Sequence, residues 1–394
     1  LLHDTGKGKE EGQEAGGARA ARSACARMGL EPKRIGLIAW LVQNHLVMSD
    51  FAQKRDVSDP RTVEAFARIV ETPERLRLLL ILTVADIRAV GPGVWNGWKG
   101  QLMRELHDAT LSWFRGARVS HPSGHERGPA SPAEDEANPA AQAFVDAMED
   151  AYRGAFDRTA RAGHAALAAE AMARGGAAAQ MSVRPGMNAA ELTVAAPDRP
   201  GLFADLASGM AALGANVVGA RLYTSKGGQA LDVFYLQDAL GGAYGGEDRH
   251  SQTRLFRAIE AAADVKVQAL AEPAGMADRR GAAFAITSVV GVDNEASDDC
   301  TVVEASGRDR RGLLGALARA MAAAGVSVQS AHIDNYGERA VDAFYVQGPG
   351  GRKLTAARVE ALRAALLEVL EAAEHPAGAK PGRRLQQARA SVAR

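Results

Sequence analysis

A sequence segment that occurs twice constrains the fold of this chain more than any other feature. Residues 198–203 (DRPGLF) return 111 residues later as 309–314 (DRRGLL), and residues 232–235 (DVFY) return 110 residues later as 342–345 (DAFY). The single lost residue falls in a Gly-containing stretch between the two matches, where a hairpin turn tolerates a change of length. We therefore expect two copies of one folding unit.

Each copy alternates strand-like and helix-like patterns. The pattern predicts a strand, a helix, two strands joined by a hairpin, a second helix and a closing strand, which is the ferredoxin-like βαββαβ order. In the first copy the closing strand is expected at residues 265–270. Two such units in tandem can pair sheet edges that would otherwise stay open.

The first 118 residues have a different pattern, because apolar residues recur there at helical spacing, as in Ile35, Ile38 and Val42. The expected fold class is therefore α+β, an all-helical domain followed by two ferredoxin-like units. The expected organisation is a helical domain truncated at its N-terminus over 1–118, a Pro-rich linker and Ala-rich helical connector over 119–187, the two copies over 188–275 and 298–375, and a basic, disordered tail over 376–394.

Composition excludes several classes of function. The 394 residues carry 47 Lys and Arg against 47 Asp and Glu, so no overall positive field argues for a nucleic-acid partner or an anionic membrane. Two cysteines cannot form a disulfide framework and fit a reducing cytoplasm. No apolar run approaches the roughly 20 residues that span a bilayer. We expect a cytoplasmic protein and, because residue 1 is Leu, the C-terminal portion of a longer polypeptide.

Three residues far apart in the sequence are candidates for a metal site. His3 and Asp4 are adjacent, and Asp86 lies in an otherwise apolar helix-like segment, where a carboxylate needs an ion pair or a metal. Imidazole and carboxylate suit Zn, Mn, Fe or Mg, so the residues do not fix the metal. Lys7 could meet a phosphate. A surface helix cap and a salt-bridged Asp86 explain the same residues without a metal, and His45 is either a site residue or an interior histidine.

The chain resembles one known family through motifs in both halves. Residues 2–8 (LHDTGKG) with 86–88 (DIR) look like the HD superfamily of metal-dependent phosphohydrolases. The longer string 83–89 (TVADIRA) is similar to the bifunctional uridylyltransferase/uridylyl-removing enzymes, which modify the PII nitrogen-signalling protein. Residues 293–297 (DNEAS) and 336–339 (YGER) are similar to the last regulatory domain of the same family.

The resemblance implies a multifunctional enzyme. A nucleotidyltransferase domain that transfers UMP to PII would precede this chain, an HD domain would hydrolyse the uridylyl-tyrosine of PII with metal-activated water, and two ACT domains would sense glutamine. It implies His3, Asp4 and Asp86 as ligands of a divalent metal, magnesium or manganese, with His45 as a further candidate. Lys7 would neutralise phosphate charge.

The chain departs from the family pattern at two positions. Gln13 and Asn44 stand where family members usually carry histidine, and amides are poorer ligands for such a metal. Two alternatives therefore stay open. One is an amino-acid-sensing fragment whose helical domain has decayed to a scaffold, and the other is a different HD hydrolase of the guanosine-polyphosphate type.

The repeated turn predicts a second kind of site. Each copy leads from a strand into a helix N-terminus, where free backbone N–H groups favour a carboxylate. In ACT domains, which the copies resemble, amino acids bind near this turn at a domain interface, so that an Asp could accept from the ligand's ammonium and an Asn could bind it. Helix capping and turn formation explain the same residues without a ligand. The candidate glutamine-binding residues are Asp198, Gly201, Leu202, Asn216, Asp309, Gly312 and Leu313.

Overall fold

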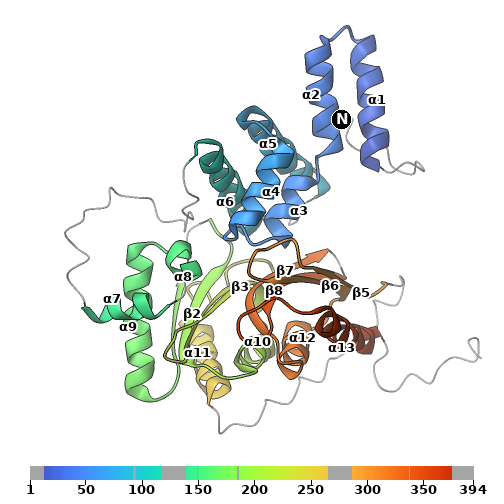
Figure 1. The fold of residues 1–394 in the computed structure, drawn as a ribbon. Coiled ribbons are helices and arrows are strands. Elements are labelled where there is room, and N and C mark those ends of the chain that lie inside the picture. Colours follow the sequence, from blue (N-terminus) through green and yellow to red (C-terminus); the bar gives the residue numbers. More distant parts are fainter. Residues whose placement is uncertain are drawn as a thin grey trace, which may run out of the picture.

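The computed structural model describes residues 13–91, 95–116, 139–148, 150–183, 186–264, 286–336 and 338–374. The N-terminal part of this range is helical (Figure 1). Its helices are α1 (Gln13–Arg27), α2 (Pro32–Gln43), α3 (Val47–Lys54), α4 (Pro60–Val70), α5 (Pro73–Val90) and α6 (Gly97–Phe114). None of the helices in the described ranges combines the length and apolarity of a membrane span.

Polar side chains fix where three of these helices begin. Asp59 accepts a hydrogen bond from the backbone N–H of Arg61 at the start of α4, Thr72 caps α5 and Asn96 caps α6. Proline occupies the first turn of α4 and α5, where a backbone N–H has no intrahelical partner. Helices α1 and α2 pack on each other as a hairpin that extends away from the rest of the molecule (Figure 1).

The C-terminal part contains one eight-stranded sheet with the order β1-β2-β4-β3-β7-β8-β6-β5. Its neighbouring strands all run antiparallel. The elements are α7 (Pro139–Ala147), α8 (Asp150–Ala155), α9 (Arg158–Arg174), β1 (Ala178–Val183), β2 (Ala190–Pro197), α10 (Leu202–Ala212), β3 (Asn216–Thr224), β4 (Gln229–Gln237), α11 (Arg249–Ala263), β5 (Val289–Asp293), β6 (Thr301–Arg308), α12 (Leu313–Ala323), β7 (Ser327–Tyr336), β8 (Arg339–Gln347) and α13 (Ala356–Glu374).

The two copies lie side by side in this sheet, as the tandem repeat predicts. They meet where β3 pairs with β7, over Gly219 with His332, Ala220 with Ala331 and Arg221 with Ser330. The α+β class and the strand-helix-hairpin-helix core of each copy are confirmed.

The outer strands correct the predicted βαββαβ order. In each copy the edge strand precedes the first strand of the repeat, β1 beside β2 and β5 beside β6, so the described residues read ββαββα. The closing strand expected at 265–270 lies outside the described residues. A strand directly before β2 or β6 reaches the antiparallel edge position through a short connection, which is why the same place in the sheet is filled from the other end of the unit.

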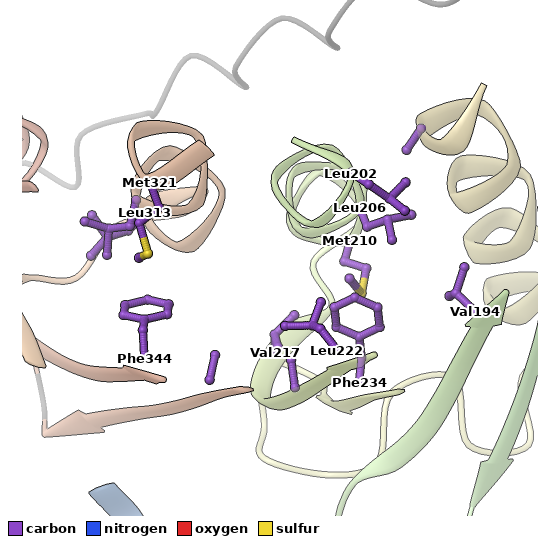
Figure 2. Packing of buried hydrophobic residues seen from close by; sticks show 14 of the residues in the cluster. Val194, Leu202, Leu206, Met210, Val217, Leu222, Phe234, Leu313, Met321 and Phe344 are labelled. Atoms are coloured by element: carbon purple, nitrogen blue, oxygen red, sulfur yellow. The ribbon is translucent and has the colours of Figure 1, made fainter. Parts of the chain in front are cut away.

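Both faces of the sheet are buried. Phe234 and Leu236 of β4 belong to the core under α10–α13, whereas Val233 and Tyr235, on the opposite side of the same strand, belong to a core with α3–α6 and α7–α9. Figure 2 shows the first core, with Phe234 beneath the side chains of α10 and Phe344 beneath those of α12. The helical part and the repeats are therefore one packed body.

Candidate functional sites

Of the predicted metal-site residues, the structure describes only Asp86 and His45, because His3, Asp4 and Lys7 lie outside the described residues. Asp86 is half-buried on α5. His45 lies between α2 and α3, is 2% exposed, and holds its Nδ1 2.8 Å from the carbonyl oxygen of Val42. The hydroxyl of Thr83, one turn before Asp86, lies 3.5 Å from the carbonyl oxygen of His45, so the two candidates come from adjacent elements.

The described residues contain no cluster of three or more His, Cys, Asp or Glu side chains that could hold a metal. Asn44, which replaces a family histidine, donates from its side-chain amide to the carbonyl oxygen of Trp40 at 2.8 Å and ends α2. Its side chain therefore has a structural role. The metal site stays a prediction.

The repeated turn of the first copy opens onto a cleft between the two copies, with a cavity volume of about 560 Å³. One wall is the turn 198–201, the start of α10 and parts of β3 and β4; the other is the end of α12, the start of β7 and the turn after β8. The lining residues used below are Asp198, Arg199, Gly201, Leu202, Thr224, Asp232, Ser327, Gln329 and Gln347.

Gly201 shapes the cleft end of α10. Its φ of +85° is a left-handed conformation that glycine adopts without strain, and it is the residue that begins the helix. Among the described residues, no side chain caps α10. The N–H of Leu202 donates to the carbonyl oxygen of Arg199 at 3.1 Å, which leaves the N–H groups of Phe203 and Ala204, two lining residues, as the potential carboxylate site that the sequence predicts. Leu202 is buried beneath this turn.

Two acids stand at this end of the cleft. Asp198 accepts a hydrogen bond from the hydroxyl of Thr224 at 2.9 Å. Asp232, on β4, is 4% exposed and has no hydrogen-bond or ion-pair partner among the described residues. Burial, with a further contribution from the charge of Asp198, raises the pKa of Asp232 well above its usual range. Sequence reasoning missed Asp232 as a site residue, although it belongs to the repeated DVFY segment.

Arg199, the one cation among the described lining residues, is already neutralised. Arg199 lies 2.8 Å from Asp205 and donates to the carbonyl oxygen of Ala262 at 2.7 Å. Because the remaining lining residues are uncharged, the cleft presents acidic groups next to a helix N-terminus. This combination suits a zwitterion, which carries an ammonium and a carboxylate close together.

The structure does not bring Asn216 together with Asp198 in this cleft. Asn216 is exposed at the start of β3 and is not part of the lining, whereas Ser327, its counterpart 111 residues later, is. The cleft is thus assembled from complementary parts of the two copies.

The turn of the second copy does not line the cleft either. Gly312 begins α12 with a φ of +82°, and Leu313 is buried as Leu202 is. Asp309 accepts a hydrogen bond from the side-chain amide of Asn335 at 3.1 Å, and desolvation raises its pKa. Asp342, the counterpart of Asp232, is 2% exposed, and its Oδ1 has no hydrogen-bond partner among the described residues.

A polar seam joins the helical part to the sheet where the two copies meet. The backbone N–H of Asp56 donates to the hydroxyl of Tyr345 at 2.9 Å. Burial alone would raise the pKa of Asp56, but His332, Arg221 and hydrogen bonds from two serines lower it below its usual range. Arg221 and His332 belong to the paired stretch of β3 and β7. The helical part is therefore fixed to the junction of the copies.

A comparison with models of known protein families found no match. Individual proteins do match over the whole chain. It is 59% identical over its full length to the bifunctional uridylyltransferase/uridylyl-removing enzymes of Caulobacter vibrioides and Phenylobacterium zucineum, and 38% identical over 95% of its length to that of Gluconobacter oxydans. The chain spans 43% of the first two proteins and 40% of the third. The resemblance predicted from the motifs is confirmed, and a fragment of such a protein fits.

Proposed function

We propose that this chain is the C-terminal part of an enzyme that uridylylates and deuridylylates the PII nitrogen-regulatory protein, and that it carries the uridylyl-removing and glutamine-sensing functions. The observation that supports this most is the 59% identity over the whole chain to enzymes with that name, across helical part and repeats alike. Nucleotidyl transfer would belong to the remainder of the enzyme.

The helical part would hydrolyse the phosphodiester between UMP and a tyrosine of PII. His3, Asp4 and Asp86 would hold a divalent metal, magnesium or manganese, which would lower the pKa of a bound water. The Nδ1 of His45 lies 2.8 Å from the carbonyl oxygen of Val42, a contact in which Nδ1 is the donor, so a ligand role of His45 would fall to its Nε2. Lys7 would neutralise charge on the phosphate.

The cleft between the copies would bind glutamine. The α10 N-terminus favours the ligand's carboxylate and the acids favour its ammonium. Gln329 donates to the hydroxyl of Ser327 at 3.1 Å, which orients the carbonyl oxygen of Gln329 as an acceptor for a ligand amide. Because the walls come from both copies, a bound ligand would favour one arrangement of the copies over another.

Release of UMP from uridylylated PII tests this function. It is measured with the longer enzyme that contains this chain, with and without glutamine, and with its Asp86→Ala form. We expect Asp86→Ala to reduce release at least about 100-fold, since a lost metal ligand removes the activated water. Asp50→Ala, which changes an exposed acid on α3, is the matched control and should leave release unchanged. Undiminished release by Asp86→Ala would reject the metal site.

A second candidate is an amino-acid sensor whose helical part is only a scaffold. The observation that favours it is Asn44, whose amide ends α2 where the family pattern has a histidine. Metal analysis of the purified longer protein separates the two functions. Stoichiometric metal supports the hydrolase, and its absence together with retained glutamine binding supports the sensor.

A further inference from the structure

Asp232 is a buried acid that lacks a counter-charge. It lies on β4 between Leu231 and Val233, both fully buried, and only 4% of its own surface is exposed. Buried carboxylates are normally paired with a cation or satisfied by hydrogen bonds, because removing the charge from water is costly. Asp232 has neither kind of partner among the described residues, yet it lines a cleft large enough for a small molecule.

The charged groups around Asp232 make a positive group the fitting occupant. Asp198 approaches from the turn and adds negative charge. Arg199 lies 2.8 Å from Asp205 and is the one basic residue that the described part of the chain contributes to the lining. Apart from these groups, the described lining residues carry no charge.

The expected position of the ligand's carboxylate indicates which positive group would lie against Asp232. The α10 N-terminus and Asp232 both line the same cleft, and Gly201 begins the helix there without a side chain of its own. An α-amino acid carries its carboxylate and its ammonium on one carbon atom. Its side chain then extends toward the uncharged wall from the second copy.

We propose that Asp232 is the specificity-determining anchor of the cleft and that it binds the α-ammonium group of the amino-acid ligand. This rests on the proposed sensing function and adds the residue that selects α-amino acids over carboxylic acids of the same shape. No covalent bond forms or breaks.

One consequence is proton release on binding. Burial raises the pKa of Asp232 in the free protein, so its carboxyl group keeps its proton to a higher pH than an exposed aspartate does. The ligand's ammonium stabilises the carboxylate, and the proton leaves Asp232 for the solvent. The affinity for an amino acid should therefore rise as pH rises, until Asp232 is ionised in the free protein as well.

Calorimetric titration of the full 394-residue chain with glutamine tests the anchor. We expect Asp232→Asn to weaken binding about 10- to 100-fold, since a charged hydrogen bond is lost. Asp342→Asn makes the same change at the matched position of the second copy and should alter affinity less than about twofold. Glutaramate, which is glutamine without its amino group, should bind the unaltered chain as weakly as glutamine binds Asp232→Asn.

A second measurement needs no variant. Titrations of the unaltered chain in two buffers of different ionisation enthalpy should differ, because the released proton is taken up by the buffer. Equal affinity of Asp232→Asn and the unaltered chain overturns the proposal. If another amino acid binds instead of glutamine and Asp232→Asn weakens it, the anchor stands and glutamine is the wrong effector. If no amino acid binds, both the anchor and the sensing function are wrong.

Discussion

The two copies share a backbone but hold their turns differently. Gly201 and Gly312 have nearly the same left-handed φ, and each begins a helix with a buried leucine. In the first copy, Arg199 lies 2.8 Å from Asp205, which also accepts from Arg319 of the second copy at 3.3 Å. One acid thus ties the first turn to its own helix and to its neighbour.

The second copy has no counterpart of that acid. Ala316 stands where the first copy has Asp205, so Arg310, the counterpart of Arg199, lacks that carboxylate; the Nε atoms of both arginines are buried without a hydrogen-bond partner among the described residues. Duplication preserved the fold, while single side chains make the two turns different.

The largest effect should come from the two cores, where the copies are alike. Phe234 and Phe344 are fully buried at equivalent positions. We expect Phe234→Ala and Phe344→Ala each to lower the free energy of unfolding by about 3–5 kcal/mol, because each leaves a cavity. Urea denaturation followed by circular dichroism measures both. A loss below about 1 kcal/mol for one of them would show that the cores are not equivalent.

Replacing Asp342 by asparagine should raise the free energy of unfolding at pH 7. Burial raises the pKa of Asp342, so the folded state holds a proton that the unfolded state has lost, and stability falls as pH rises from about 4. Asp342→Asn removes this pH dependence of stability, so the variant should be no more stable than the unaltered chain near pH 4. Thermal unfolding from pH 4 to 8 measures the difference in stability.

Asp232→Asn should give the same gain without ligand, because burial raises the pKa of Asp232 as well. Saturating glutamine should cancel the stability gain of Asp232→Asn and leave the stability gain of Asp342→Asn intact. A gain that persists with ligand in both variants contradicts the difference between the copies.

Removing the bridging acid should cost about 1–2 kcal/mol. Asp205→Ala leaves Arg199 and Arg319, both partly buried, without their shared carboxylate. Glu338→Ala, which removes an exposed partner of Arg308, is the control and should cost less than about 0.5 kcal/mol. Thermal unfolding compares the two variants. Equal losses would mean that the first turn is held no more tightly than the second.

The smallest effect should come from the turn glycines. A Cβ added at Gly201 or Gly312 would meet no atom within 4 Å. Each Gly→Ala substitution should therefore lower the free energy of unfolding only by the strain of a left-handed alanine, about 1 kcal/mol. The two variants should lose the same stability. They should differ in glutamine binding, and calorimetry should show weaker binding for Gly201→Ala alone. Equal weakening in both variants would place ligand at both turns.

The sequence pattern predicted what depends on local chemistry. The helical first part and the core strands of each copy follow from residue type and periodicity. The repeat also predicted that the copies share a sheet. These features depend only on residues close in sequence or on the similarity of the two copies.

The missed features depend on tertiary placement. Strand β1 comes from an Ala-rich segment with little strand preference, and it forms because β2 needs an outer partner. The far wall of the cleft depends on how closely α10 and α12 approach, and this is set by Gly315, where a Cβ would meet the hydroxyl of Ser208 at 2.4 Å. Asp232 is hidden in an apolar run, where a single acid suggests an interior position rather than a site.

The sheet with two buried faces limits how this protein can be taken apart. The repeats suggest that residues 188–374 are a portable sensor, yet Leu231, Val233 and Tyr235 of β4 pack against helices that precede that span. A transplanted sensor would expose these side chains to water and invite aggregation. Engineering amino-acid control into another enzyme with this sheet therefore requires grafting its helical cover as well.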